Sequence, residues 1–334
     1  MTRPEAFPPG PGAHAPAPGP GAHAPRPGTW ARTRAAISDV LYRRHWFYLS
    51  LLLAPPLLWF GVVYIGSLLA LLVQSFYALD DFSGSVVPEL TLATWRDLLS
   101  SPANIDILVR TTLVATAVTI ACALLAFPIA YYMARYAQGK VKALLYLAVM
   151  LPLWANYLVR VYAWKIILAR EGVIYWIVTN LHLDWLLAAV LETPGVGGNT
   201  LSTSYLGMSL VFTYMWLPYM ILPIHAALER VPESLVQAAA DLGASPAQVF
   251  RTVTLPLALP GVVAGSIFTF SLTLGDFVIP YLVGTSAFFI GQAVYVLQGA
   301  SGNVPLAAAF SVFPIVIVSL YLALARRLGA FDAL

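Results

Sequence analysis

Six long apolar runs alternate with shorter polar segments along this chain. Each run approaches or exceeds the length of about 20 residues that a helix needs to cross about 30 Å of hydrocarbon. The pattern predicts six transmembrane helices, over residues 49–77, 108–133, 143–168, 205–227, 260–283 and 305–326. A shorter apolar stretch at 173–190 is interrupted by Asn180, His182 and Asp184, which favours an interfacial or re-entrant helix over a seventh span.

Charged residues between the apolar runs predict the orientation of the chain. Lys and Arg are concentrated before the first run, between the second and third, and after the sixth. Acidic residues dominate the loops after the first and third runs, and the loop after the fifth carries no charge. Because cytoplasmic loops carry an excess of Lys and Arg, both termini are expected to be cytoplasmic.

The composition agrees with a membrane protein. Of the 334 residues, 60% are hydrophobic and only 10% are charged, whereas about 25% of a soluble domain is charged. So few charges exclude an ordinary soluble enzyme, a disordered protein and a nucleic-acid binder. We therefore expect the chain to contact membrane lipid and not to bind nucleic acid. The single cysteine, Cys122, leaves no Cys-based metal site, and no metal is predicted.

The N-terminal residues differ from the rest of the chain. Residues 1–28 consist mainly of Pro, Gly, Ala and His, with a near-exact repeat that begins at Pro11 and again at Pro20. Such a segment buries no core. We therefore expect residues 1–46 to form a disordered tail and a basic approach, and residues 47–330 to form one transmembrane domain.

One long polar loop, at 228–258, is expected on the cytoplasmic side. A helix-start signal follows Pro232, and Gly243 ends that helix as glycine does after a C-cap. Ser245, followed by a proline, starts a second helix that is predicted to stop near Pro256. A structured helical hairpin between two spans indicates a docking element for a partner.

The sequence of this loop resembles the "EAA" signature of ABC importer permeases. In that family the pattern is Glu-Ala-Ala, three residues, Gly, nine residues, and then Ile-x-Leu-Pro, and the spacing here matches in full. Gln237 stands in the place of Glu, which removes a charge, and Val253 stands in the place of Ile. The residues to which the resemblance assigns ATPase coupling are Gln237, Ala238, Ala239, Gly243, Val253, Leu255 and Pro256.

The resemblance covers roughly residues 48–330. Two segments, 151–164 and 275–284, look like those of the spermidine/putrescine subgroup. The resemblance implies an all-α membrane protein with the type I ABC importer permease fold, in which 47–330 is the permease domain and 228–258 the coupling loop. It also implies a polyamine as the substrate, with another small organic solute as the alternative.

The same resemblance implies the partners of the chain. They are a second permease subunit, an ABC ATPase dimer and an extracytoplasmic substrate-binding protein. ATP and magnesium would then be bound by the ATPase, so that this chain is expected to hold no cofactor and to be non-catalytic. The sequence itself contains no P-loop, since Lys140 is followed by Val141 rather than by Ser or Thr.

Two other functional classes fit the sequence less well. An ion-coupled secondary transporter would be built from inverted repeats and broken helices, and no repeat relates 48–168 to 205–327. A membrane-embedded enzyme would need clustered His, Asp or Glu residues within the spans. Asp276 is the only acidic residue there.

Polar and aromatic residues in the third and fifth spans are candidates for a translocation pathway. Ionisable residues inside a membrane are costly and therefore suggest function. The hydroxyl and acidic side chains at positions 266, 269, 273 and 276 fall within an arc of about 80° on a helix. The candidates are Trp154, Tyr157, Arg160, Thr269, Thr273 and Asp276.

These candidates leave alternatives open. Aromatic rings attract ammonium groups, but the aromatic residues could equally form an interfacial belt. Arg160 would repel a polyamine unless it pairs with Asp276 or with a carboxylate of the second permease, and Asp276 could instead contact the substrate. The Gly261-x-x-x-Gly265 pattern is expected to serve close helix packing.

Overall fold

The computed structural model describes residues 45–80 and 83–327, so that nearly all of the predicted tail lies outside the described residues. The chain divides at Ser67 and Leu68 into two units, each of which is described by itself. The first contains α2 (His45–Trp59), a π-helical segment η1 (Phe60–Ile65) and the start of α3 (Gly66–Gln74). A helix long and apolar enough to cross a membrane covers Leu49–Gln74, in agreement with the first predicted span.

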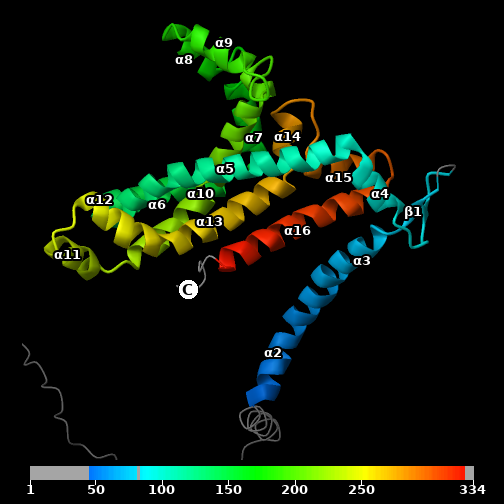
Figure 1. Ribbon diagram of the computed structural model, residues 1–334, viewed down its shortest axis with the longest axis horizontal. Coiled ribbons are helices and arrows are strands. Elements are labelled where there is room, and N and C mark those ends of the chain that lie inside the picture. Colours follow the sequence, from blue (N-terminus) through cyan, green and yellow to red (C-terminus); the bar gives the residue numbers. More distant parts are fainter. Residues whose placement is uncertain (1–44, 81–82, 328–334) are drawn as a thin grey trace, which may run out of the picture. The chain divides into compact units, whose positions relative to one another are not determined.

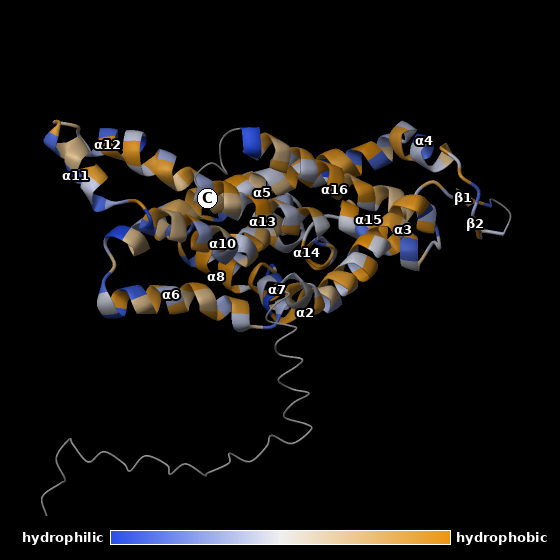
Figure 2. Ribbon diagram, turned by 90° about the horizontal axis from the view of Figure 1, so that it is seen from below, coloured by the Kyte–Doolittle hydropathy of each residue, from blue (hydrophilic) through white to orange (hydrophobic). Residues whose placement is uncertain are grey.

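Four long helices form the body of the second unit (Figure 1). Helices α5, α10 and α13 all contact one another, and α16 packs against α13. Large apolar side chains are exposed on all four helices, which are largely hydrophobic along their length (Figure 2), as expected for helices that lie in lipid. The four helices are α5 (Pro102–Arg135), α10 (Tyr205–Glu229), α13 (Leu255–Gly275) and α16 (Val304–Arg327).

Close packing between α10 and α13 depends on two glycines. A Cβ at Gly261 would lie 2.6 Å from the Cβ of Ala227 and 2.6 Å from the carbonyl oxygen of Pro223. A Cβ at Gly265 would lie 2.7 Å from the sulfur of Met220. The expectation that the Gly261-x-x-x-Gly265 pattern serves helix packing is therefore confirmed.

The third predicted span is broken rather than straight. Helices α6 (Gly139–Trp154) and α7 (Tyr157–Ile167) meet at an angle of 98°. The break follows from Asn156, whose side chain accepts hydrogen bonds from the backbone N–H groups of Leu158 and Val159 and so starts a new helix. The described residues contain five helices that could cross a membrane, or six if this pair counts as one span, which agrees with the predicted number.

The fifth predicted span, 260–283, is also interrupted. Helix α13 ends at Gly275, and the extended backbone of Asp276, with ψ of 131°, separates it from the short helix α14 (Val278–Leu282). The prediction that Asp276 belongs to a continuous helical stripe was therefore wrong. Its carboxylate instead accepts a hydrogen bond from the backbone N–H of Ile279, at 2.9 Å, which substitutes for a helical bond lost at the break.

The polar loop forms the predicted hairpin, with one correction. Helix α11 (Glu233–Asp241) is followed by α12 (Pro246–Val249) and a π-helical segment η3 (Phe250–Thr254). The second helix was predicted to stop near Pro256, but a single helix runs over Pro246–Gly275. The π turn, in which the N–H of Leu255 bonds to the carbonyl of Phe250, accommodates the proline that lacks an N–H.

Shorter elements lie at the far end of this unit from α11 and α12 (Figure 1). They are a two-stranded antiparallel pair β1 (Ala78–Leu79) and β2 (Val86–Val87), α4 (Ala93–Ser100), the 3-10 turn η2 (Leu201–Thr203) and α15 (Ile290–Gly299). The stretch predicted as one helix at 173–190 forms two, α8 (Val173–Asn180) and α9 (Asp184–Glu192). His182 lies between them with φ of 55°.

Valine in place of Gly261 should weaken the contact between α10 and α13. The added side chain would collide with Pro223 and Ala227, and overpacking of this kind costs about 1–3 kcal/mol. The thermal unfolding midpoint of the purified protein in detergent should therefore fall. Gly299→Val, at a position where a Cβ meets no atom within 4 Å, should leave the midpoint unchanged, and equal midpoints for the two variants would contradict this account.

Candidate functional site

The α11–α12 hairpin (residues 233–254) turns at Gly243, which has φ of +83°. The N–H of Ala244 bonds to the carbonyl of Ala239 at 3.1 Å, and the N–H of Gly243 bonds to Ala240 at 2.9 Å. These two bonds form a Schellman motif, in which a residue in the left-handed region closes the helix. The spacing from the alanine pair to the glycine in the sequence pattern is therefore the spacing that this turn requires.

The hairpin has a first arm, α11, and a second arm, α12 with η3, and the second arm begins with a capping box. The Ser245 hydroxyl accepts the N–H of Gln248, and the Gln248 side chain accepts the N–H of Ser245 at 2.8 Å. Both bonds satisfy N–H groups that a helix start leaves unpaired. The helix start predicted from Ser245 and the following proline is confirmed.

Aromatic side chains hold the second arm against α5. The ring of Phe250 makes edge contacts with Phe127 at 5.7 Å and with Tyr131 at 5.8 Å between centroids. Arg135, at the end of the same helix, donates to the carbonyl of Val231 at 3.1 Å, where the chain enters the hairpin. Both ends of the hairpin are thus fixed to α5.

The tip of the hairpin presents an apolar side chain to the outside. Leu242, next to the turn, is 89% exposed. The turn at Gly243 thus places this side chain at the outermost point of the hairpin. The sequence pattern gave no indication of Leu242, since its position at the tip follows only from the turn.

The other coupling candidates lie along both arms. Gln237 and Ala238 are exposed and Ala239 is half-buried. Gln237 faces a cavity of about 380 Å³ between the arms, together with Arg135 and Tyr136. In the second arm Val253 is half-buried, and Leu255 and Pro256 are exposed.

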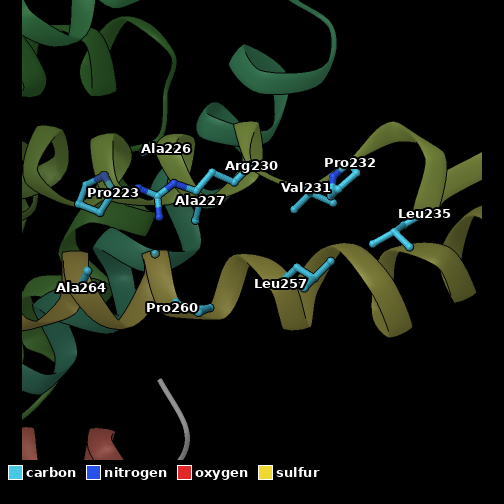
Figure 3. Close-up of a pocket in the computed structure, with 11 residues that line it drawn as sticks. Pro223, Ala226, Ala227, Arg230, Val231, Pro232, Leu235, Leu257, Pro260 and Ala264 are labelled. Carbon is cyan, nitrogen blue, oxygen red and sulfur yellow. The ribbon is translucent and has the colours of Figure 1, made fainter. Parts of the chain in front are cut away.

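A second, more apolar groove separates the first arm from the spans. It has a volume of about 340 Å³ and is lined by residues of α10, α11 and α13 (Figure 3). Leu235 lines it from the hairpin, Leu257 and Pro260 line it from α13, and Arg230 is the only charged residue among its lining residues. This groove therefore separates the first arm from the spans, whereas the second arm continues directly into α13.

The breaks in the third and fifth spans bring Tyr157, Trp216 and Asp276 together, and Arg160 lies one helical turn beyond Tyr157 on α7. We name these four residues the Asp276 cluster. The Tyr157 hydroxyl donates a hydrogen bond to the Asp276 carboxylate. The ring of Trp216, on α10, stacks on Tyr157 with centroids 6.2 Å apart and an angle of 13°. The cluster combines a carboxylate with two aromatic faces, the groups that bind an ammonium ion.

Trp216 had not been predicted. It is one apolar residue among many in the fourth span, and only 7% of its surface is exposed. Its indole Nε1 is buried and has no hydrogen-bond partner among the described residues. The same is true of Nε and Nη1 of Arg160, one helical turn beyond Tyr157.

The remaining pathway candidates lie elsewhere. Trp154, before the break, is 80% exposed and does not join the cluster. Thr269 and Thr273 are buried, and their hydroxyls donate to carbonyls of their own helix, those of Gly265 and Thr269. Among the described residues, no ion pair joins Arg160 to Asp276. The Asp276 carboxylate instead accepts the hydrogen bond from the Tyr157 hydroxyl.

Comparison with known proteins identifies the family of this chain. Residues 126–330 match the family described as binding-protein-dependent transport system inner membrane component. The chain belongs to this family. It is therefore a multi-pass membrane protein and the permease of an ABC importer, as the EAA-like pattern predicted.

Individual relatives support the same conclusion. The permease is 63% identical over 286 residues to the inner membrane ABC transporter permease protein YdcU of Escherichia coli K12, over 86% of this chain and 91% of the relative. It is 31% identical over 255 residues to the spermidine/putrescine transport system permease protein PotB of the same organism, over 76% of this chain and 88% of the relative.

Solved structures confirm the fold. A bacterial ABC transporter that imports the polysaccharide alginate contains a chain with a TM-score of 0.59 at 18% identity, over 87% of this chain and 99% of the other. The alginate transporter in complex with its pentasaccharide-bound periplasmic protein gives 0.64 at 15% identity, over 88% and 97%. The predicted all-α importer permease fold is thus confirmed.

Valine at position 243 should loosen the hairpin. A left-handed conformation costs a residue with a Cβ about 1–2 kcal/mol, and a β-branched side chain tolerates it poorly. Limited proteolysis of the purified permease should therefore cut Gly243→Val within 233–254 faster than the original protein. Gly243→Asn is the matched control, because asparagine accepts the φ of +83°, and equally fast cleavage of both variants would refute the role of the turn.

Proposed function

We propose that this permease forms part of a translocation pathway for a polyamine such as spermidine or putrescine. The observation that carries this proposal is the Asp276 cluster, where a carboxylate lies beside the rings of Tyr157 and Trp216. A polyamine carries several ammonium groups, which a carboxylate and aromatic faces attract. The 31% identity to PotB, named as a spermidine/putrescine permease, supports the same substrate class.

The alternative is the import of another small organic solute by the same machinery. Relatives of similar identity differ in cargo: the molybdenum transport system permease protein ModB of Mycobacterium bovis is 30% identical over 209 residues, covering 63% of this chain and 69% of the relative. Its cargo, unlike a polyamine, gives no reason for a carboxylate in the pathway. Asp276 therefore favours the polyamine.

Energy would enter through the α11–α12 hairpin. We propose that the hairpin is cytoplasmic, as are both termini, and that its tip at Leu242 docks in an ABC ATPase dimer that binds ATP and magnesium. A second permease subunit would complete the pathway, and an extracytoplasmic binding protein would deliver the solute. Residues 1–28 would take no part, the basic residues up to 46 would orient the chain, and 47–330 would form the permease domain.

Leu242→Asp should detach the ATPase without unfolding the permease. The side chain is 89% exposed, so that the change costs no packing within the chain, while a charge in an apolar docking contact would be desolvated. Co-purification of the ATPase with the tagged permease should fall. Leu90→Asp, at a 77% exposed leucine between β2 and α4, outside the hairpin, should leave co-purification intact, and equal losses would remove the docking assignment.

The substrate is tested by uptake of labelled spermidine and putrescine into proteoliposomes that contain the complete transporter. ATP-dependent uptake of either polyamine is expected, and its absence would reject the proposal. Asp276→Asn should lower uptake about tenfold or more, since it removes the charge that attracts the ammonium group. Assembly and basal ATP hydrolysis should persist, so that a variant that fails to assemble would indicate a structural role instead.

A further inference from the structure

Arg160 is the member of the Asp276 cluster that the proposed pathway does not explain. Its Nε and Nη1 atoms are buried and have no hydrogen-bond partner within the part of the chain that the structure describes. A buried guanidinium without an acceptor is costly, and ionisable residues in a membrane normally pair. A cation also opposes the passage of a polyamine. Both facts suggest that Arg160 gains an acceptor elsewhere in the transport cycle.

A candidate acceptor for Arg160, the Asp276 carboxylate, is held by a residue one helical turn away from it. Tyr157 and Arg160 are three residues apart on α7, and residues with this spacing lie on the same face. The Tyr157 hydroxyl donates to the Asp276 carboxylate. A displacement of one turn, about 5.4 Å, would bring the same carboxylate to Arg160.

The surrounding backbone permits such a displacement. Helix α7 begins at the break after Ala155, and α14 begins at the break after Asp276, so that each helix is connected to its span through non-helical residues. The two helices pack against each other directly. Movements of one turn between packed elements are a known form of two-state switching.

We propose that Arg160 is a gate residue that selects solutes by charge. It alternates with Tyr157 in binding the Asp276 carboxylate. In the state described, Tyr157 holds the carboxylate, and the free charge of Arg160 repels cations from the pathway. When Asp276 passes to Arg160, that charge is neutralised, and the rings of Tyr157 and Trp216 become available to ammonium groups. This role rests on the proposed import of a polyamine.

The gate is tested by passive leak rather than by uptake. Proteoliposomes with the complete transporter and no ATP are loaded with labelled putrescine, a four-carbon dication, or with labelled succinate, a four-carbon dianion. Arg160→Gln should raise the putrescine leak about tenfold, the lower end of what a focused charge does to ion entry, and should leave the succinate leak no higher, because loss of a positive charge does not favour entry of an anion. Arg160→Lys keeps the positive charge and should keep the low putrescine leak of the original protein. Lys165→Gln, which changes an exposed residue on the same helix, should also leave the putrescine leak unchanged.

A second variant tests the exchange itself. Tyr157→Phe removes the hydroxyl that holds Asp276, and should raise the putrescine leak because Asp276 then neutralises Arg160. A leak that rises with Arg160→Gln and not with Tyr157→Phe would place the partner of Arg160 elsewhere, for instance on the second permease, and would overturn the exchange. An unchanged leak in Arg160→Gln would overturn the gate. Failure of polyamine uptake by the original transporter would reject the substrate instead, whatever the leak shows.

Discussion

Inside a hydrocarbon layer, each backbone N–H and C=O group has to find its partner within the protein. This constraint decides where the helices of the permease can be interrupted. At the break in the third span, the side chain of Asn156 accepts two backbone N–H groups, and at the break in the fifth span the Asp276 carboxylate accepts one. Polar side chains thus replace the lost helical bonds. Because Asp276 also bonds to Tyr157, the same carboxylate that allows the break joins the two broken spans.

The two candidate sites differ in how firmly they are built. The α11–α12 hairpin is closed by backbone hydrogen bonds at Gly243, capped at Ser245, and fixed to α5 through Phe250. A structure with this many local constraints moves as one body. The Asp276 cluster has hydrogen-bond donors on Arg160 and Trp216 without acceptors among the described residues, so that its side chains are less firmly fixed than those of the hairpin.

The sequence predicted the helical spans and the hairpin well, because apolar length and capping residues are local signals. It failed where an apolar run continues through a break, since hydropathy does not register a change of direction at residues 155–156 or 276–277. The arc that grouped Thr273 with Asp276 assumed one continuous helix, and it lost its meaning once α13 ended at Gly275. Trp216 and Leu242 were missed because their importance arises from neighbours that are distant in sequence or from the position of a turn.

The helix over Pro246–Gly275 joins the two sites mechanically. At 1.5 Å per residue its 30 residues extend about 45 Å, and Gly261, where α10 crosses most closely, lies at its midpoint. If the helix tilts about its close contact with α10 at Gly261, it acts as a lever whose two arms have equal length. A tilt of about 14° would shift either end by about 5.4 Å, or one helical turn. Such a tilt would displace the hairpin end and the Asp276 end of the helix by equal distances in opposite directions.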